Sequence, residues 1–183
     1  MKNKDFFLSR LQKSLEDQTF TDFEWVVTEE GKMAENTNAA IKKAKGEIIK
    51  IIYLDDYLAH KNSLKNIVEN WKGGWLVTGC NHDNRKNKFS DHIPTVNGLP
   101  FDINTIGSPS VLAFENKNPL LFDENLSWLL DVDLYKRLYK QYGEPTIIES
   151  TDVTIGLHDG QMTNLLTPEE KQKEADYLTT KKI

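Results

Sequence analysis

Residues 47–57 read Glu-Ile-Ile-Lys-Ile-Ile-Tyr-Leu-Asp-Asp-Tyr and decide the fold class. The stretch from 47 to 54 is the most continuous apolar run in the chain. Runs of this kind are typical of strands buried on both faces, so we predict a central strand over 47–54. It ends abruptly at Asp55-Asp56. Open α/β sheets bind ligands at the carboxyl ends of their strands, which makes the acidic pair a candidate site.

Helix-like and strand-like segments alternate around this strand. We predict helices over 5–17, 33–45, 61–71 and 124–141, and strands over 24–28, 75–80, 111–115 and, as two short pieces, 145–157. The polar stretch 81–106 is predicted to be a long loop that becomes ordered when a ligand binds. Thr167-Pro168-Glu169-Glu170 has the pattern of a capping box. The alternation predicts a three-layer α/β domain over 1–166, followed by a charged C-terminal helix or tail over 167–183.

Composition narrows the class of protein. The chain has 183 residues, a formal net charge of -5 and one cysteine. The slight acidity argues against nucleic acid as a partner. A lone cysteine favours a reducing compartment, and no apolar run reaches the roughly 20 residues of a membrane span, so we expect a cytoplasmic protein without a transmembrane segment.

Two carboxylates at Asp55 and Asp56 repel one another unless a cation or a hydrogen-bond donor offsets their charge. Oxygen ligands of this kind suit Mg²⁺ or Mn²⁺ bound together with a diphosphate. The alternative interpretation is a helix cap or a solvated turn before residue 61.

Two further residues are candidates for chemistry. On a helix, Asp131 lies about 100° from the apolar face of Leu130 and Leu134, at the edge of the core, where a carboxylate suits a general base. Alternatively, Asp131 only complements the helix dipole. His158 follows a strand-like run and is a possible ligand of Mn²⁺-class ions or an ordinary surface histidine.

Other candidates are less distinctive. Trp128 precedes Asp131 by three positions and is the tryptophan expected to line a site. Glu29-Glu30-Gly31 is either a turn that ends a strand or a second acidic contact at the same sheet edge.

The order of these motifs along residues 8–164 resembles family 2 glycosyltransferases, which have the GT-A fold. The matching residues are Gln18 to Val27, Glu29-Glu30-Gly31, Asn38-Ala39-Ala40, Ala44-Lys45-Gly46-Glu47, Leu54-Asp55-Asp56, Ile106-Gly107-Ser108-Pro109-Ser110 and Asp131 to Leu138. The resemblance implies a Rossmann-like, nucleotide-diphospho-sugar transferase-like mixed sheet flanked by helices.

The same resemblance implies a metal-dependent, inverting enzyme of the hexosyltransferase type. Its donor would be a UDP or GDP sugar and its acceptor an unidentified hydroxyl compound. Asp131 would be the catalytic base, and Mn²⁺ or Mg²⁺ would be held by Asp55, Asp56 and His158. Donor-binding residues would be Glu29, Glu30, Lys32, Asn38, Asp55, Asp56 and Trp128.

The chain also departs from the family pattern. It begins after the family's usual first strand, its two aspartates are adjacent where Asp-x-Asp is commoner, and Leu130 stands where many members carry glutamate. These departures keep two alternatives open: a truncated or inactive nucleotide-sugar-binding module, and a nucleotide-sugar hydrolase in which water replaces the acceptor.

Overall fold

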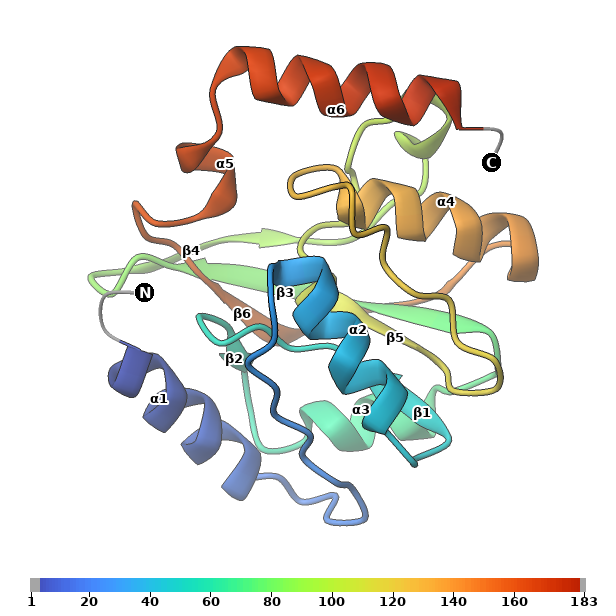
Figure 1. Ribbon diagram of the computed structural model, residues 1–183. Coiled ribbons are helices and arrows are strands. Elements are labelled where there is room, and N and C mark those ends of the chain that lie inside the picture. Colours follow the sequence, from blue (N-terminus) through green and yellow to red (C-terminus); the bar gives the residue numbers. More distant parts are fainter. Residues whose placement is uncertain (1–3, 182–183) are drawn as a thin grey trace.

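The computed structural model describes residues 4–181, and it contains one mixed sheet (Figure 1). Its strands are β1 (Ile48–Lys50), β2 (Tyr57–Leu58), β3 (Trp75–Asp83), β4 (Lys88–His92), β5 (Leu112–Glu115) and β6 (Thr146–Gly156). The order is β1-β5-β3-β6-β2, with β4 paired to β3. Only β3 and β6 pair in parallel; the other pairs are antiparallel. It follows that β1, β3 and β6 all run in the same direction.

Helices cover both faces of this sheet (Figure 1). They are α1 (Lys4–Glu16), α2 (Met33–Lys43), α3 (Ser63–Glu69), α4 (Leu130–Tyr142), α5 (Met162–Leu165) and α6 (Pro168–Thr180). Two 3₁₀ turns, η1 (Leu99–Phe101) and η2 (Pro109–Val111), connect strands. The helices predicted over 5–17, 33–45 and 61–71 are confirmed within a few residues, as is the capping box at Thr167, whose hydroxyl accepts from the Glu170 N–H.

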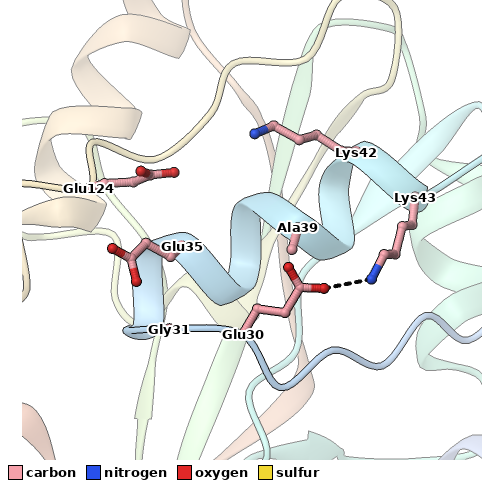
Figure 2. Close-up of a pocket in the computed structure, with 7 residues that line it drawn as sticks. All are labelled: Glu30, Gly31, Glu35, Ala39, Lys42, Lys43 and Glu124. Carbon is pink, nitrogen blue, oxygen red and sulfur yellow. Dashed lines mark hydrogen bonds and ion pairs between the residues drawn. The ribbon is translucent and has the colours of Figure 1, made fainter.

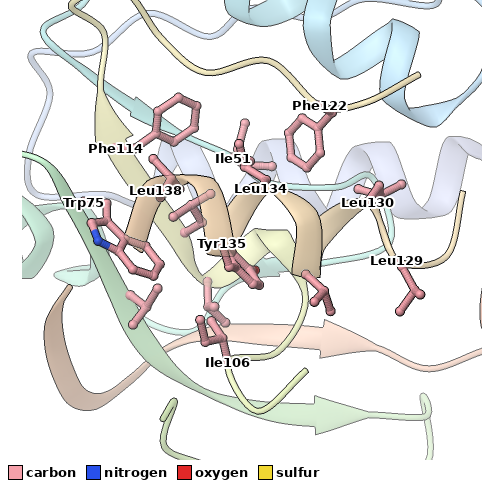
Figure 3. Packing of buried hydrophobic residues seen from close by; sticks show 14 of the residues in the cluster. Ile51, Trp75, Ile106, Phe114, Phe122, Leu129, Leu130, Leu134, Tyr135 and Leu138 are labelled. Carbon is pink, nitrogen blue, oxygen red and sulfur yellow. The ribbon is translucent and has the colours of Figure 1, made fainter. Parts of the chain in front are cut away.

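The strand side chains alternate between two hydrophobic clusters, which shows that there are three layers. Trp75 and Val77 of β3 pack in the larger cluster with residues of α2, α4 and α6, whereas Leu76 packs in the smaller cluster with residues of α3. Figure 3 shows the larger cluster, in which the α4 side chains Leu134, Tyr135 and Leu138 are fully buried. The predicted mixed α/β fold class is therefore confirmed.

The prediction of a strand over 24–28 is wrong. This segment forms neither strand nor helix, and Phe23, Trp25 and Val27 are exposed. A strand needs a neighbour for its backbone groups, and within residues 4–181 the edge strand β1 pairs only with β5. Side chains hold the segment instead, because the Glu24 carboxylate accepts hydrogen bonds from the Gly46 and Lys45 N–H groups.

The apolar run at 47–54 also differs from its prediction. Only Ile48–Lys50 form a strand, and this strand lies at an edge of the sheet rather than at its centre. Ile49 and Ile51 are nevertheless buried. The run is apolar because its side chains pack in both hydrophobic clusters, Ile49 and Ile51 in the larger one and Ile48 and Ile52 in the smaller one.

Three other segments are more regular than predicted or begin later. The polar stretch 81–106 contains the end of β3, all of β4 and η1, so it is not one long loop. The two pieces predicted at 145–157 are one strand, β6, whose pairing shifts register near Gly79. The helix predicted over 124–141 begins only at Leu130, after turns. No helix within residues 4–181 has the length and apolar character of a membrane span.

Candidate active site

The site is built on the segment that joins β1 to β2. Because these strands lie at opposite edges of the sheet, residues 51–56 must cross the strands between them. They do so at the carboxyl ends of β1, β3 and β6, as shown by two contacts: the Gly156 N–H at the end of β6 donates to Asp56 Oδ1 at 2.9 Å, and Tyr53 N–H donates to Ser110 Oγ at 2.9 Å. The acidic pair therefore lies where the sequence predicted it, at the ligand-binding edge of an α/β sheet.

The side chains of Asp55 and His158 lie together at this edge. His158 Nε2 is 3.0 Å from Asp55 Oδ2, and both side chains are largely buried. Arg10 of α1 reaches the same turn, donating from Nη2 to the Asp55 carbonyl oxygen at 2.5 Å and lying 4.3 Å above the Tyr57 ring. The second guanidinium nitrogen of Arg10, Nη1, is 3.4 Å from the carboxylate of Asp83, the last residue of β3. Residues from α1, β3 and β6 thus fix the conformation of the acidic turn.

Asp56 points the other way, into the protein. Its side chain is almost fully buried and accepts hydrogen bonds from the Gly156 N–H and, at 3.3 Å, from the Ser108 hydroxyl. Burial and then the charge of Asp55 raise the pKa of Asp56 to about 7. The Asp55 carboxylate contacts His158 instead, so the two carboxylates do not converge on one point.

These donors fit a divalent cation in part. Among residues 4–181, no three side chains of His, Cys, Asp or Glu form a ready metal cage. Asp55 and His158 offer one carboxylate and one imidazole side by side, a donor set that Mn²⁺ accepts. The buried Asp56 carboxylate lies behind them, where hydrogen bonds and the charge of Lys50 act on it. A cation at Asp55 and His158 would further relieve the repulsion between the two aspartates.

Asp131 lies in the first turn of α4 and is half-buried. Its Oδ1 accepts from the Val132 N–H at 2.7 Å, and its Oδ2 accepts from Asn104 Nδ2 at 2.7 Å. Burial raises the pKa of Asp131 to about 7 against these hydrogen bonds, which lower it. A carboxylate with this pKa can accept a proton at neutral pH.

Tyr53 connects the two acidic regions. Burial raises its pKa, and the charges of Asp131, Asp56 and Asp55 raise it further. The phenol therefore lies within electrostatic reach of both the acidic turn and the start of α4. The structure brings Asp55, Asp56 and His158 together, and Asp131 lies close enough to Tyr53 for its charge to act on the phenol.

The residues predicted around Glu29 lie elsewhere, at the start of α2. Glu29 pairs with Lys4, and Glu30 pairs with Lys43 at 2.7 Å. Lys32 is the N-cap of α2. A groove of about 480 Å³ lies along this helix. Figure 2 shows the residues that line it, which are Glu30, Gly31, Glu35, Ala39, Lys42, Lys43 and Glu124. None of these seven residues belongs to the group around Asp55 and Asp131.

Asn38 and Trp128 have structural contacts. The buried Asn38 side chain donates to the Phe122 carbonyl at 2.9 Å and accepts from the Phe122 N–H at 2.8 Å, which fastens the segment before α4 to α2. Trp128 lies two residues before α4, and the Lys171 ammonium is 5.5 Å from the centre of its ring. Both residues hold the surroundings of α4 in place.

Sequence reasoning missed several residues of the site. Arg10, Asn104 and Glu174 contact it from α1, from the loop after η1 and from α6. No local pattern marks them, because each reaches the site only through the tertiary fold.

Comparisons with known proteins identify similar structures. No family model matches the chain, and no curated protein matches it. Crystal structures of S. aureus TarS are similar: TarS 1-349 shares 19% identity with a TM-score of 0.63, covering 85% of this chain and 58% of that one. The same protein in complex with UDP-GlcNAc shares 16% identity with a TM-score of 0.64, covering 96% of this chain and 62% of that one. TarS 1-349 in complex with UDP shares 17% identity with this chain, with a TM-score of 0.63.

At this identity the likeness establishes the fold. The chain has the fold of GT-A type glycosyltransferase domains, as the motif order predicted. It spans about three fifths of the length of the TarS 1-349 structures that it matches.

Proposed function

We propose that this protein transfers a sugar from a nucleoside diphosphate donor to an acceptor hydroxyl. The observation that carries the proposal is the pairing of Asp55 with His158 at the carboxyl ends of the strands, with Asp131 nearby, in a chain with a GT-A type fold. The crystal structures of TarS 1-349 in complex with UDP and with UDP-GlcNAc support a nucleotide-sugar donor, and a UDP sugar is the first donor to test. Membership of family 2 remains a prediction from the motif order.

The acidic turn and His158 form the proposed site for the cation and the donor diphosphate. Asp55 and His158 would hold Mn²⁺ or Mg²⁺ against the donor diphosphate, and Asp56 would add negative charge behind them. The cation, when bound, supplies Lewis-acid stabilisation of the departing diphosphate. Arg10 holds the turn that carries Asp55 through its bond to the Asp55 carbonyl oxygen.

Asp131 would act as the general base. Its carboxylate accepts the proton of the acceptor hydroxyl while that oxygen bonds to the anomeric carbon and the bond from this carbon to the diphosphate oxygen breaks. Attack from the face opposite the leaving group inverts the anomeric centre. Asn104 fixes the orientation of the base by its hydrogen bond to Oδ2.

Calorimetric titration with UDP and GDP, with and without Mn²⁺, tests the donor site. We expect one nucleotide to bind more tightly with the metal, and Asp55→Asn to weaken that binding by more than about tenfold. Asp159→Asn is the matched control, because Asp159 is an exposed acid next to His158. Equal affinity in the wild type and in Asp55→Asn, each with Mn²⁺, would contradict the assignment.

Turnover separates the proposal from its alternatives. Asp131→Asn should retain donor binding and lose transfer to an acceptor. Full consumption of the donor without any acceptor would favour a hydrolase. Donor binding without turnover under any condition, equally in the wild type and in Asp131→Asn, would favour a binding module.

A further inference from the structure

The C-terminal helix α6 contacts the start of α4 through one carboxylate. Glu174 accepts hydrogen bonds from three consecutive backbone N–H groups, those of Ser127 and Trp128 at 2.8 Å and that of Leu129 at 2.9 Å. Leu129 is the N-cap of α4 and has no side-chain cap of its own. A residue 45 positions later in the sequence therefore supplies the cap of this helix.

We propose that Glu174 is a positioning residue for Asp131: by taking up the positive end of the α4 dipole, it keeps the Asp131 carboxylate available as a base. This inference rests on the proposed function, in which Asp131 receives the acceptor proton. It extends that function by assigning a role to the C-terminal helix.

The electrostatic argument starts from the position of Asp131. It is the second residue of α4, and its own carboxylate accepts the Val132 N–H. A helix N-terminus carries a positive partial charge that favours an ionised carboxylate and so weakens it as a base. Glu174 places a full negative charge at the same helix end, which opposes this effect.

The groups around Asp131 come from every element packed on it. Glu174 of α6 raises the pKa of Asp131 by its charge, after the larger effect of burial. The other titratable neighbours are Tyr53 before the acidic turn and Tyr135 of α4, whose burial and then the charge of Asp131 raise their pKa values, so both stay neutral at pH 7. The loop after η1 contributes the neutral Asn104 side chain.

Glu174 is held firmly enough for this role. In α6, Leu178 is 1% exposed and packs in the larger cluster. Lys181, which follows α6, pairs with Asp123 at 2.6 Å and with Asp133 of α4. The helix thus fixes the distance between Glu174 and the start of α4.

NMR titration of aspartate carboxyl carbons tests the inference without any need for activity. We expect the Asp131 midpoint to fall by about half to one pH unit in Glu174→Gln, which keeps the shape and removes the charge. Glu169→Gln is the matched control, because it removes an exposed glutamate of the same helix. An unchanged midpoint in a folded Glu174→Gln variant would overturn the proposal.

The wild type provides a second test if Glu174→Gln does not fold. An Asp131 midpoint near 4 in the wild type would refute the proposal, because Glu174 would then not be opposing the effect of the helix dipole on Asp131. The acid limb of the kcat/KM profile should shift with the midpoint, which a merely structural cap would not cause. If the midpoint shifts but Asp131→Asn still transfers sugar, the proposed function fails and the electrostatic link between α6 and α4 stands.

Discussion

Replacing Asp131 by asparagine should change how the stability of this protein depends on pH. The folded protein raises the pKa of Asp131 from 3.8 to about 7. Below about pH 4 the carboxyl group is protonated in both the folded and the unfolded state, so there it does not lower the free energy of unfolding. As the pH rises to about 7, the unfolded chain releases this proton first, and the free energy of unfolding falls.

The size of this loss follows from the shift. About three pH units at about 1.4 kcal/mol each give about 4 kcal/mol, which is lost between about pH 4 and pH 7. Asparagine does not titrate, so Asp131→Asn lacks this loss. Its amide also disturbs the hydrogen bonds from Val132 and Asn104, but that cost does not depend on pH.

Urea denaturation from pH 4 to pH 8 measures the effect. The stability of Asp131→Asn relative to wild type should rise by up to about 4 kcal/mol across this range, while other titrating groups, including Asp56, cancel in the difference. The exposed Asp159→Asn variant should show no such rise. A difference between Asp131→Asn and wild type that is constant from pH 4 to pH 8 would refute the reasoning.

Three further changes have defined outcomes. Gly156→Ala should destabilise the protein by about 3 kcal/mol and weaken nucleotide binding, because its Cβ would lie 2.0 Å from the Asp55 carbonyl oxygen; unaltered urea denaturation would contradict this close approach. Arg10→Met should cost about 2–3 kcal/mol in the same assay, because it leaves the largely buried Asp83 carboxylate without its ion pair; adding Asp83→Asn should recover part of the loss, and no recovery would argue against the pair. Cys80 is 1% exposed, and burial raises its pKa to about 11, so iodoacetamide at pH 8 should modify it only in urea; rapid modification of the native protein would show that the thiol is accessible.

The fold could be predicted from the sequence to a considerable extent. Helical periodicity located α1, α2 and α3, and the end of the 47–54 run located the acidic turn. These features depend on local patterns, which survive in a single sequence. The strand predicted over 24–28 is wrong because, within residues 4–181, this segment does not pair with the edge strand β1, and β-branched and aromatic residues alone do not create such pairing.

The candidate site was less accessible to prediction. Asp55, Asp56 and His158 were expected together and lie together, but the inward orientation of Asp56 depends on Gly156, 100 positions later. The cap of α4 likewise depends on a distant residue, because Glu174 accepts the N–H groups that precede this helix. Contacts between distant positions leave no periodic signal, so the sequence predicted which side chains lie together better than it predicted what orients them.

The strand order also has a consequence for synthesis. Among residues 4–181, β2 pairs only with β6, and β6 also forms the parallel pair with β3. In the same described part of the chain, β3 and β4 are the only consecutive strands that pair, so most of the sheet joins segments that are far apart in the sequence. Such topologies fold slowly. During translation, β2 and the turn that carries Asp55 stay unpaired until residues 146–156 have left the ribosome. These segments are therefore exposed to chaperones in the meantime.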